Sequence, residues 1–362
     1  MVKSYWQNRS RFAAVCLVGG FLFCSSLLAS QNGGLPGAPL RLSAGAWASA
    51  MGGAASADPQ FMISWYNPSR LPLLRERRAS VGAGLRSLGR TEGWASLDFR
   101  VPPRMGMGLS FLYRGDPFLD GMYDGYYDQG TVVEEKALSG MNYSFFNMKI
   151  GVGYLVSKKL SMGASMAIMH QSLPTTPQGD GVLNSTSTSI GAFDIAATYK
   201  LNKEVTLAAL LKNVGARNSW TISSDEGYGQ TIDEKMAPSI VMAGSYKGRF
   251  LDRDLLWNLD LVNYVFDSDW TLFEYPEMVI STGVRWDFRD DLLLRAGLGD
   301  IELSSELYRR SEQYRDGFSP RMSLGFTYRL DKWHQGLLFN YALTSDRIWA
   351  GVDQQFDLTL AF

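Results

Sequence analysis

The chain has 362 residues and a formal net charge of −1, and 46% of its residues are hydrophobic. A chain this close to neutral lacks the basic face that nucleic-acid binding requires, so nucleic acid is excluded as a partner. Its two cysteines, Cys16 and Cys24, both lie within the first thirty residues. The rest of the chain therefore has no thiol for a disulfide, a cysteine–metal site or a cysteine nucleophile.

Residues 1–30 have the three parts of a secretory signal peptide. A basic start is followed by an apolar core from residue 13 to 28, and Ala29 or Ser30 supplies a small residue at the cleavage point. The apolar core is shorter than the ~20 residues of a membrane-spanning helix, and bulky residues before both cysteines argue against a lipoprotein. We therefore predict cleavage near Ala29/Ser30 and export from the cytoplasm.

Residues 31–78 do not alternate in hydrophobicity and form a separate segment, in which residues 40–67 indicate a small-residue helix or loop. They contain two short motifs, Met51-Gly52-Gly53-Ala54 and Trp65-Tyr66-Asn67-Pro68, with Asp58 between them. Both are rich in residues that favour turns and close packing. We treat the motif residues Met51, Gly52, Gly53, Trp65, Asn67 and Pro68 as candidate site residues of this segment.

The remaining chain has no run of ~18 apolar residues that would predict a transmembrane helix. A membrane can also be crossed by β-strands of ~9–11 residues, which turn only every second side chain toward lipid. Alternating hydrophobicity is the signal of such a strand, and it is present from residue 79 to the end of the chain.

Residues 104–114 illustrate the alternation. Small residues fall on one face, and the large apolar residues on the other are Met105, Met107, Leu109, Phe111 and Tyr113. Segments 190–201 and 278–288 repeat the pattern, with aromatic residues near the strand ends, which is typical of a lipid-facing strand. A soluble β-sandwich or propeller also alternates and is the alternative at this point.

Fourteen segments alternate in this way, and an even number is expected of a bacterial barrel with both ends in the periplasm. The segments are residues 79–89, 93–101, 104–114, 142–156, 160–170, 188–201, 205–213, 237–247, 255–265, 277–288, 291–299, 320–330, 334–344 and 355–362. After the first hairpin, short and long connections between these segments alternate. An outer-membrane barrel has this arrangement, because its periplasmic turns are short and its extracellular loops are long. We predict an all-β fold, a 14-stranded antiparallel transmembrane β-barrel over residues 79–362 in outer-membrane lipid.

The last predicted strand carries a separate signal at its end. Phe356, Leu358, Leu360 and the terminal Phe362 fall on one face. A strand that ends in an aromatic carboxy-terminal residue resembles the signal recognised by the barrel-assembly machinery. We therefore expect this machinery to be a partner.

The motifs Met51-Gly52-Gly53-Ala54 and Trp65-Tyr66-Asn67-Pro68, together with Lys212-Asn213-Val214-Gly215 and Ala237-Pro238, resemble the PorV/PorQ branch of the FadL-like outer-membrane barrels. The chain departs from that signature by inserting Tyr66, by carrying Ser69-Arg70 in place of alanine and glycine, and by Lys212 where the family has glutamine. The resemblance implies a fourteen-stranded barrel in the outer membrane of a bacterium. It also implies that the amino-terminal segment enters the lumen or caps its periplasmic side.

The resemblance leaves two functions open. Proteins of the PorV kind act in type IX secretion, where they bind exported proteins that carry a carboxy-terminal signal domain. FadL carries hydrophobic small molecules across the outer membrane. The implied partners are exported cargo proteins or type IX translocon components in the first case, and a hydrophobic ligand in the second.

The inferred lumen and loops favour the first function. A carrier of fatty acids needs an apolar pocket, whereas the inward positions are small, polar or charged. The charged ones include Arg285, Asp287, Arg295, Arg329 and Asp357, which we expect to brace one another and the plug. The extracellular loops are tyrosine-rich, and the candidate contacts to a protein partner are Tyr126, Tyr127, Trp220 and Tyr308.

Few residues suggest chemistry. Aspartates recur every four residues at Asp116, Asp120, Asp124 and Asp128, but without a calcium-loop pattern, which favours a solvated loop. His170 and His334 are the only histidines and lie far apart in the sequence, so neither a metal site nor a catalytic triad has support. We predict no enzyme activity, no metal site and no cofactor, and a solvated periplasmic rim at Arg75, Arg77 and Arg78.

Overall fold

The computed structural model describes residues 37–116, 123–128, 131–137, 143–178, 181–224, 229–265, 277–302, 320–345 and 351–362. The predicted signal peptide and the candidate contact Tyr308 lie outside these residues. Tyr126 and Tyr127 lie within a described strand, but their side chains are outside the description.

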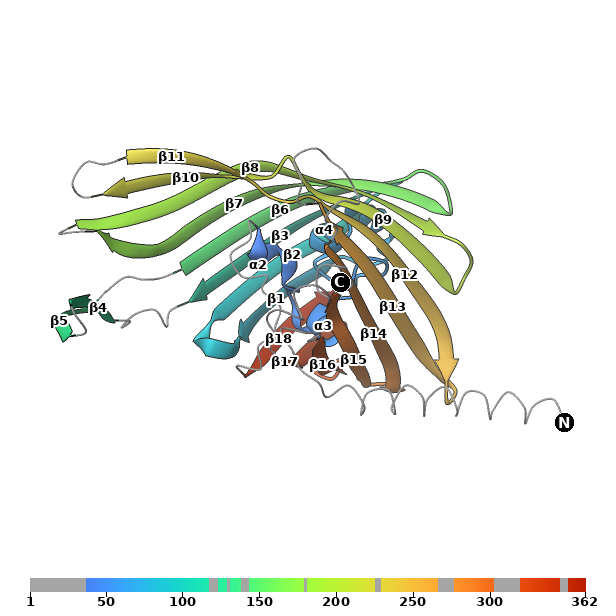
Figure 1. Cartoon of the computed structure of the whole chain (residues 1–362). Helices are drawn as coiled ribbons and strands as arrows, with labels where there is room; N and C mark the ends of the chain where they lie inside the picture. The colour runs from blue at the N-terminus through green and yellow to red at the C-terminus, as the bar shows by residue number, and fades with distance from the viewer. Residues whose placement is uncertain are drawn as a thin grey trace.

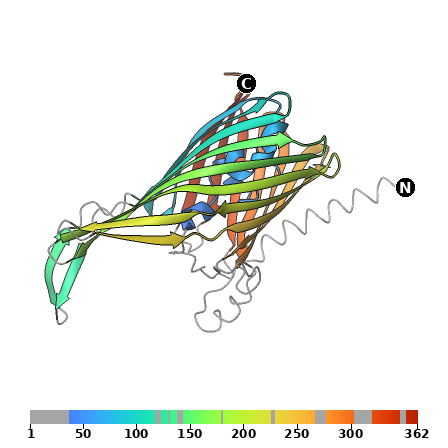
Figure 2. The same cartoon turned by 90° about the horizontal axis from the view of Figure 1, so that it is seen from above.

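Within the described residues, fourteen antiparallel strands form a closed barrel (Figures 1 and 2). The first and last strands pair from Arg78 opposite Ala361 to Leu85 opposite Gln354, and this pairing closes the ring. The predicted 14-stranded antiparallel barrel is therefore confirmed. The strands are β1 (Arg78–Leu85), β2 (Thr91–Val101), β3 (Met105–Asp116), β6 (Tyr143–Leu155), β7 (Leu160–Gln178), β8 (Gly181–Lys200), β9 (Val205–Val214), β12 (Ser239–Phe250), β13 (Arg253–Tyr264), β14 (Glu277–Arg289), β15 (Leu292–Glu302), β16 (Arg321–Arg329), β17 (Leu337–Ser345) and β18 (Val352–Ala361).

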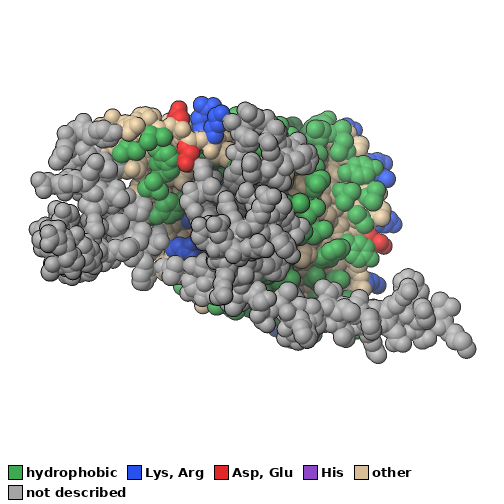
Figure 3. All heavy atoms as spheres, in the orientation of Figure 1, with side chains coloured by type: hydrophobic (Ala, Val, Ile, Leu, Met, Phe, Trp, Pro, Cys, Tyr) green, Lys and Arg blue, Asp and Glu red, His purple; other side chains and the backbone are tan. Residues whose placement is uncertain are grey.

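Successive side chains point alternately outward and into the lumen. On the outside, Phe193 is 49% exposed and Phe356 is 47% exposed, whereas on the inside Ser110, Thr198 and Asp357 are at most 1% exposed. Hydrophobic side chains cover much of the barrel wall in Figure 3. A soluble sandwich or propeller buries its apolar face, so this inverted arrangement favours a barrel surrounded by lipid.

The two ends of the barrel differ in their connections. At one end, which we call the turn side, strands join through short turns such as residues 102–104 and 201–204. β1 begins and β18 ends at this side, where the Phe362 N–H donates to the Arg77 carbonyl over 3.0 Å. The opposite end is the loop side. There β1 ends at Leu85, whereas the sequence predicted a strand as far as residue 89. The helix η2 (Ser87–Gly89) follows and leads into β2.

Three of the predicted long loops contain further strands. β7 and β8 extend so far that most of the predicted loop 171–187 is strand. The prediction was wrong there because it relied on an apolar face, and residues 184–189 are polar on both faces. The other additions are β4 (Tyr123–Asp128) with β5 (Thr131–Ala137), and β10 (Arg217–Ser224) with β11 (Gly229–Lys235). β10 pairs with residues 183–187 near the start of β8, and the sheet projects beyond the barrel there (Figure 2).

The segment from Gly37 to Arg77 lies inside the barrel, and we call it the plug. It runs from the loop side, where Arg114 donates to the Pro39 carbonyl, to the turn side, where the Leu71 backbone lies against Gly106. None of the described helices is long and apolar enough to cross a membrane. The plug contains α2 (Ala38–Arg41), α3 (Ala46–Ala50), α4 (Ile63–Tyr66) and η1 (Pro68–Leu73) (Figure 1).

The largest hydrophobic core lies between the plug and the barrel wall. Trp47 of α3 is fully buried and meets Phe61 edge to face, with ring centres 5.9 Å apart. Burial of each large apolar side chain contributes roughly 1.5–3 kcal/mol, so packing alone gives the plug a strong preference for the lumen. The other large members of this core are Met51, Met62, Trp65, Trp94, Leu112, Phe145 and Met169.

Candidate functional site: the plugged lumen

Three buried carboxylates of the barrel wall accept hydrogen bonds from backbone N–H groups of the plug. They are Asp98 of β2, Asp260 of β13 and Asp357 of β18, and we call them the wall carboxylates. Charge-assisted bonds of this kind are stronger than neutral ones. The bonds run from Ala46 to Asp357 (3.0 Å), from Ile63 to Asp98 (2.9 Å), and from Ala55 and Ser56 to Asp260 (3.1 and 2.9 Å).

The motif Met51-Gly52-Gly53 forms a close contact between plug and wall. Gly52 and Gly53 have φ angles of 67° and 87°, which glycine adopts more readily than other residues. A Cβ on Gly52 would lie 2.6 Å from the Leu298 carbonyl carbon, so a side chain cannot be accommodated without movement. The Gly52 N–H also donates to Ser323 Oγ over 3.0 Å. The motif therefore lets the plug backbone lie directly on the wall.

Asn67 joins two parts of the plug to β8. Its Nδ2 donates to the Ser56 carbonyl over 2.7 Å and to Thr198 Oγ1 over 3.0 Å, and its Oδ1 accepts from the Ser69 N–H over 3.1 Å. Pro68 follows as the first residue of η1, where its missing N–H leaves no helical bond unmade. Because Asn67 is completely buried, these bonds fix the plug at this point.

On the turn side, Asp58 of the plug forms ion pairs with Arg70 of the plug and Lys247 of β12. Lys247 Nζ lies 2.8 Å from Asp58 Oδ2. Burial by itself would raise the pKa of Asp58, but the charges of Arg70 and Lys247 outweigh it and hold this pKa below its ordinary value. Asp58 is therefore a charged link between the plug and the wall.

The three arginines expected at a solvated rim behave differently from one another. Arg75 and Arg77 are exposed. Arg78 is only partly exposed, and its guanidinium donates to the Gln60 carbonyl of the plug. The expectation of a purely solvated rim is therefore wrong for Arg78, because the plug reaches the turn side next to β1.

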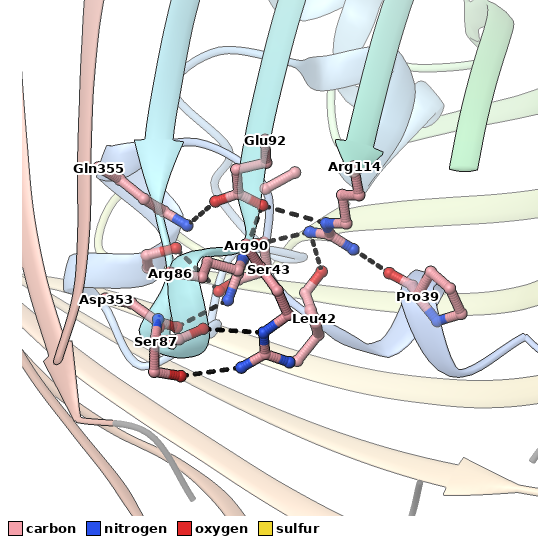
Figure 4. A network of polar contacts seen from close by, with 12 residues as sticks. Pro39, Leu42, Ser43, Arg86, Ser87, Arg90, Glu92, Arg114, Asp353 and Gln355 are labelled. Carbon is pink, nitrogen blue, oxygen red and sulfur yellow. Dashed lines mark hydrogen bonds and ion pairs between the residues drawn. The ribbon is translucent and has the colours of Figure 1, made fainter. Parts of the chain in front are cut away.

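On the loop side, a network of charged side chains connects the wall to the plug (Figure 4). Arg86 lies between two carboxylates, 2.9 Å from Glu92 and 2.8 Å from Asp353. Burial would lower the pKa of Arg86, but these two carboxylates raise it above its ordinary value. Arg114 lies 3.0 Å from the same Glu92. It also donates to the plug carbonyls of Pro39, Leu42 and Ser43.

A cavity of about 110 Å³ lies between the plug and the wall near the loop side. Apolar and aromatic side chains, among them Trp65 and Val241, line it together with the cationic Lys149 and Lys212. The Lys149 ammonium lies 4.9 Å from the centre of the Trp65 ring and 2.7 Å from Asp194. The lining therefore mixes apolar side chains with many polar and charged ones.

Of the candidate protein contacts, Trp220 has a described side chain, and it does not line this cavity. Trp220 lies in β10, where its Nε1 donates to Glu234 of β11 over 3.1 Å. Tyr126 and Tyr127 lie in the β4–β5 hairpin, and Tyr308 lies outside the described residues. The predicted assembly residues Phe356, Leu358, Leu360 and Phe362 follow the outward face of the last strand.

Sequence reasoning missed most of the charged residues that hold the plug. Glu92, Arg114 and Lys149 all occupy inward positions of their strands, so alternation carries a signal for them. Their partners come from distant parts of the sequence: Lys149 pairs with Asp194, and Arg86 links Glu92 to Asp353. Alternation within one strand cannot supply such pairs.

The two histidines lie in different parts of the barrel, His170 within β7 and His334 in a turn. His170 Nδ1 lies 3.0 Å from Thr188 Oγ1 across β7 and β8, whereas His334 lies in the turn before β17. In the part of the chain that the structure describes, no three His, Cys, Asp or Glu side chains are grouped to hold a metal ion.

Comparisons with known proteins identify solved structures with a similar fold. No protein-family model and no curated protein matches the sequence. Among solved structures, the chain is similar to the Ralstonia pickettii toluene transporter TbuX, with 14% identity, a TM-score of 0.60, and coverage of 88% of this chain and 98% of that chain. It is similar to the P. putida toluene transporter TodX with 14% identity, a TM-score of 0.57, and coverage of 88% of this chain and 99% of that chain. It is also similar to a Pseudomonas aeruginosa FadL homologue, with 12% identity, a TM-score of 0.52, and coverage of 85% of this chain and 95% of that chain. The chain therefore shares the fold of these three proteins.

Proposed function

We propose that this chain is an outer-membrane transporter that admits small apolar or amphipathic molecules through its lumen. The cavity between plug and wall carries this proposal, since it places the apolar side chains of Trp65, Val241 and Val262 beside polar and charged groups at the loop side, as an amphipathic molecule requires. The apolar outer surface suits a lipid bilayer. The similarity in fold to barrels named as toluene transporters points in the same direction.

This proposal revises the preference for protein binding drawn from the sequence. The inward positions of the strands are polar, as expected, but many of their groups bind the plug rather than face open space. The plug adds the aromatic rings of Trp65 and Tyr66 to the cavity lining, beside Val241 and Val262 of the wall. An apolar site can therefore form in a barrel whose strands alone predict a polar lumen.

Uptake by cells tests the proposal. A strain that lacks its own uptake proteins for small hydrocarbons would be given this chain, and the entry of radiolabelled toluene and of glucose would be measured. We expect toluene entry to rise severalfold while glucose entry stays at the level of the empty strain. Equal toluene entry with and without the folded barrel would refute transport of this class of molecule.

Passage through the lumen requires the plug to move. A disulfide bond engineered between the plug and the wall tests this requirement. A Cβ on Gly53 would lie 3.7 Å from Ser281 Oγ of β14, within reach of an engineered disulfide. We expect the Gly53→Cys/Ser281→Cys variant to transport only after reduction. The two single-cysteine variants are the matched controls and should be insensitive to reduction.

A second candidate function is binding of exported proteins in the manner of PorV, with type IX translocon components or cargo as partners. The projecting sheet of β7, β8, β10 and β11 favours it, because it offers strands beyond the lipid-covered wall (Figures 1 and 2). Alanine at Tyr126, Tyr127, Trp220 and Tyr308 tests this candidate. Loss of co-purified proteins bearing the carboxy-terminal signal domain, with toluene entry unchanged, would favour it over transport.

A further inference from the structure

A group of basic side chains lies on the turn side of the barrel, and we call it the basic arc. It comes from three hairpins that follow one another around the wall, β2–β3, β6–β7 and β8–β9. The Leu155 N–H donates to the Arg104 carbonyl over 2.8 Å, which joins the first two hairpins, and the Lys200 N–H donates over the same distance to residue 159, which joins the second and third. The members of the basic arc, all exposed, are Arg104, Lys158, Lys159, Lys200 and Lys203.

The protein does not neutralise the charges of the basic arc. Glu204 is the only acidic residue in the connections 102–104, 156–159 and 201–204. No side chain of the basic arc forms an ion pair with a described residue. The next part of the rim differs, because the arginines beside the β12–β13 and β14–β15 turns have aspartate partners. These pairs are Arg249 with Asp254 (3.7 Å), Arg253 with Asp290 (2.5 Å) and Arg289 with Asp291 (3.2 Å).

The basic arc lies at the edge of the lipid-facing surface. Tyr154 of β6 and Tyr199 of β8 point outward, and each is the last residue but one of its strand. Tyrosines at the ends of spanning strands lie at the level of the lipid headgroups. Lys158 and Lys203 each follow one of these tyrosines by four residues, and a lysine reaches a headgroup with its charge while its stem stays on apolar surface. Figure 3 shows Lys and Arg side chains beyond the hydrophobic band at this end of the barrel.

We propose that the basic arc binds the headgroups of anionic phospholipids, such as phosphatidylglycerol, in the membrane leaflet at the turn side. Basic side chains beside a bilayer are attracted to anionic lipids, and this attraction falls off within a Debye length. An acidic protein is the other kind of partner that suits a basic surface. The continuity of the basic arc with the lipid-facing wall favours lipid. Because the site lies on the outside of the barrel, the inference is independent of transport through the lumen.

Native mass spectrometry of the purified full-length barrel, with lipid added to the detergent solution, tests the site. Phosphatidylglycerol is compared with phosphatidylcholine of the same acyl chains, which carries the phosphate but no net charge. We expect phosphatidylglycerol to bind severalfold more tightly than phosphatidylcholine. This difference should shrink as the concentration of ammonium acetate rises, because salt screens exposed charges.

Variants of the basic arc locate the binding. The triple variant Lys158→Gln/Lys159→Gln/Lys203→Gln changes only exposed turn residues, so the barrel should fold as before. We expect it to bind phosphatidylglycerol no more tightly than phosphatidylcholine, with its phosphatidylcholine affinity unchanged. Arginine at the same three positions keeps the charge and should retain the preference for phosphatidylglycerol.

The matched control is Arg249→Gln/Arg253→Gln/Arg289→Gln, which removes as many charges from the part of the rim where they are paired. It should keep most of the preference for phosphatidylglycerol. Equal affinity of the native barrel for the two lipids, or an equal loss in both glutamine variants, would overturn the inference. Soluble polyglutamate covers the other kind of partner. If it binds through the basic arc while the two lipids bind equally, the surface serves an acidic protein and the lipid site is wrong.

Discussion

Asp357 Oδ2 accepts a hydrogen bond of 3.0 Å from the backbone N–H of Ala46, the first residue of α3. The residue before α3, Gly45, provides no side-chain cap, and neither does Met62 before α4, where Asp98 accepts from the Ile63 N–H instead. The first N–H groups of a helix have no partner within the helix. The barrel wall therefore caps the plug helices, so the plug conformation depends on its position in the lumen.

The first prediction concerns this capping. Asp98→Ala should leave the barrel folded but loosen the plug, because a lost cap or buried acceptor costs roughly 1–3 kcal/mol. Limited proteolysis should then cut residues 37–77 severalfold faster while the heat-modifiable barrel remains. Asp98→Asn keeps an acceptor oxygen and should be cut at an intermediate rate, and Asp254→Ala, at the exposed start of β13, should behave like the native protein. Native cleavage rates in Asp98→Ala would contradict capping by the wall.

The second prediction uses the glycines of the wall. A Cβ on Gly297 of β15 would collide with the Gly52 N–H, whereas a Cβ on Gly244 of β12 would meet only Leu207, at 3.9 Å. We expect Gly297→Ala to displace the plug and raise its proteolysis, and Gly244→Ala to have little effect. A plug equally protected in both variants would show that the wall and the Gly52 backbone can separate without cost.

The strands could be predicted from the sequence because lipid and lumen impose a period of two on every spanning segment. Residues 104–114 and 190–201 carry that period, and both are found in β3 and β8. The extension of β8 through residues 184–189 was missed because a strand outside the membrane needs no apolar face. Its pairing with β10 stabilises it instead.

The site could be predicted only in part. The plug motif was identified, since Gly52 and Asn67 belong to recognisable turns, and both contact the wall. The cavity was not predicted, because it combines Trp65 of the plug with Lys149 of β6 and Lys212 of β9. Which inward residues face open space depends on where the plug lies, and the local sequence carries no signal for that.

The third prediction is a dependence on pH through Asp58. Its pKa lies below the ordinary value of 3.8 in the folded protein, so its ion pairs stabilise the plug above that value. This stabilisation is lost as the pH falls through the lower folded-state pKa. Hydrogen exchange of plug peptides should therefore accelerate at pH 3 relative to pH 6. Asp58→Asn is measured at the same two pH values, because the intrinsic exchange rate itself changes with pH. Its plug peptides should already exchange faster than those of the native protein at pH 6. If the ratio of the exchange rates at pH 3 and pH 6 is identical in the native protein and Asp58→Asn, Asp58 is excluded as the titrating group.

The fourth prediction is the orientation of the barrel. Loop-side residues Tyr126, Gly179, Gly227 and Tyr308 should face the outside of the cell, and the turn-side residues Lys158 and Asp331 the periplasm. Single cysteines at these positions report directly, since the chain has no cysteine after Cys24. A membrane-impermeant thiol reagent should label the first group on intact cells and the second only after lysis. Labelling of Lys158→Cys but not Tyr126→Cys on intact cells would reverse the orientation.

The fifth prediction concerns Phe362 at the carboxy terminus. Its N–H and carbonyl pair with the Arg77 backbone, both at 3.0 Å, beside the seam that closes β18 onto β1, and its side chain is 54% exposed on the outside. If this aromatic group is part of the assembly signal, Phe362→Asp should leave export intact but lower the amount of heat-modifiable barrel severalfold. Phe362→Tyr keeps an aromatic ring and should assemble like the native protein.

A loss of yield in Phe362→Asp has a second possible origin, since the charge also lies at the edge of the lipid-facing surface. The urea concentration that unfolds the purified barrel separates the two origins. An unchanged midpoint with a lower yield places the defect in assembly, because the finished barrel is then as stable as the native one. A midpoint that falls in step with the yield places it in barrel stability, and an unchanged yield removes Phe362 from the assembly signal altogether.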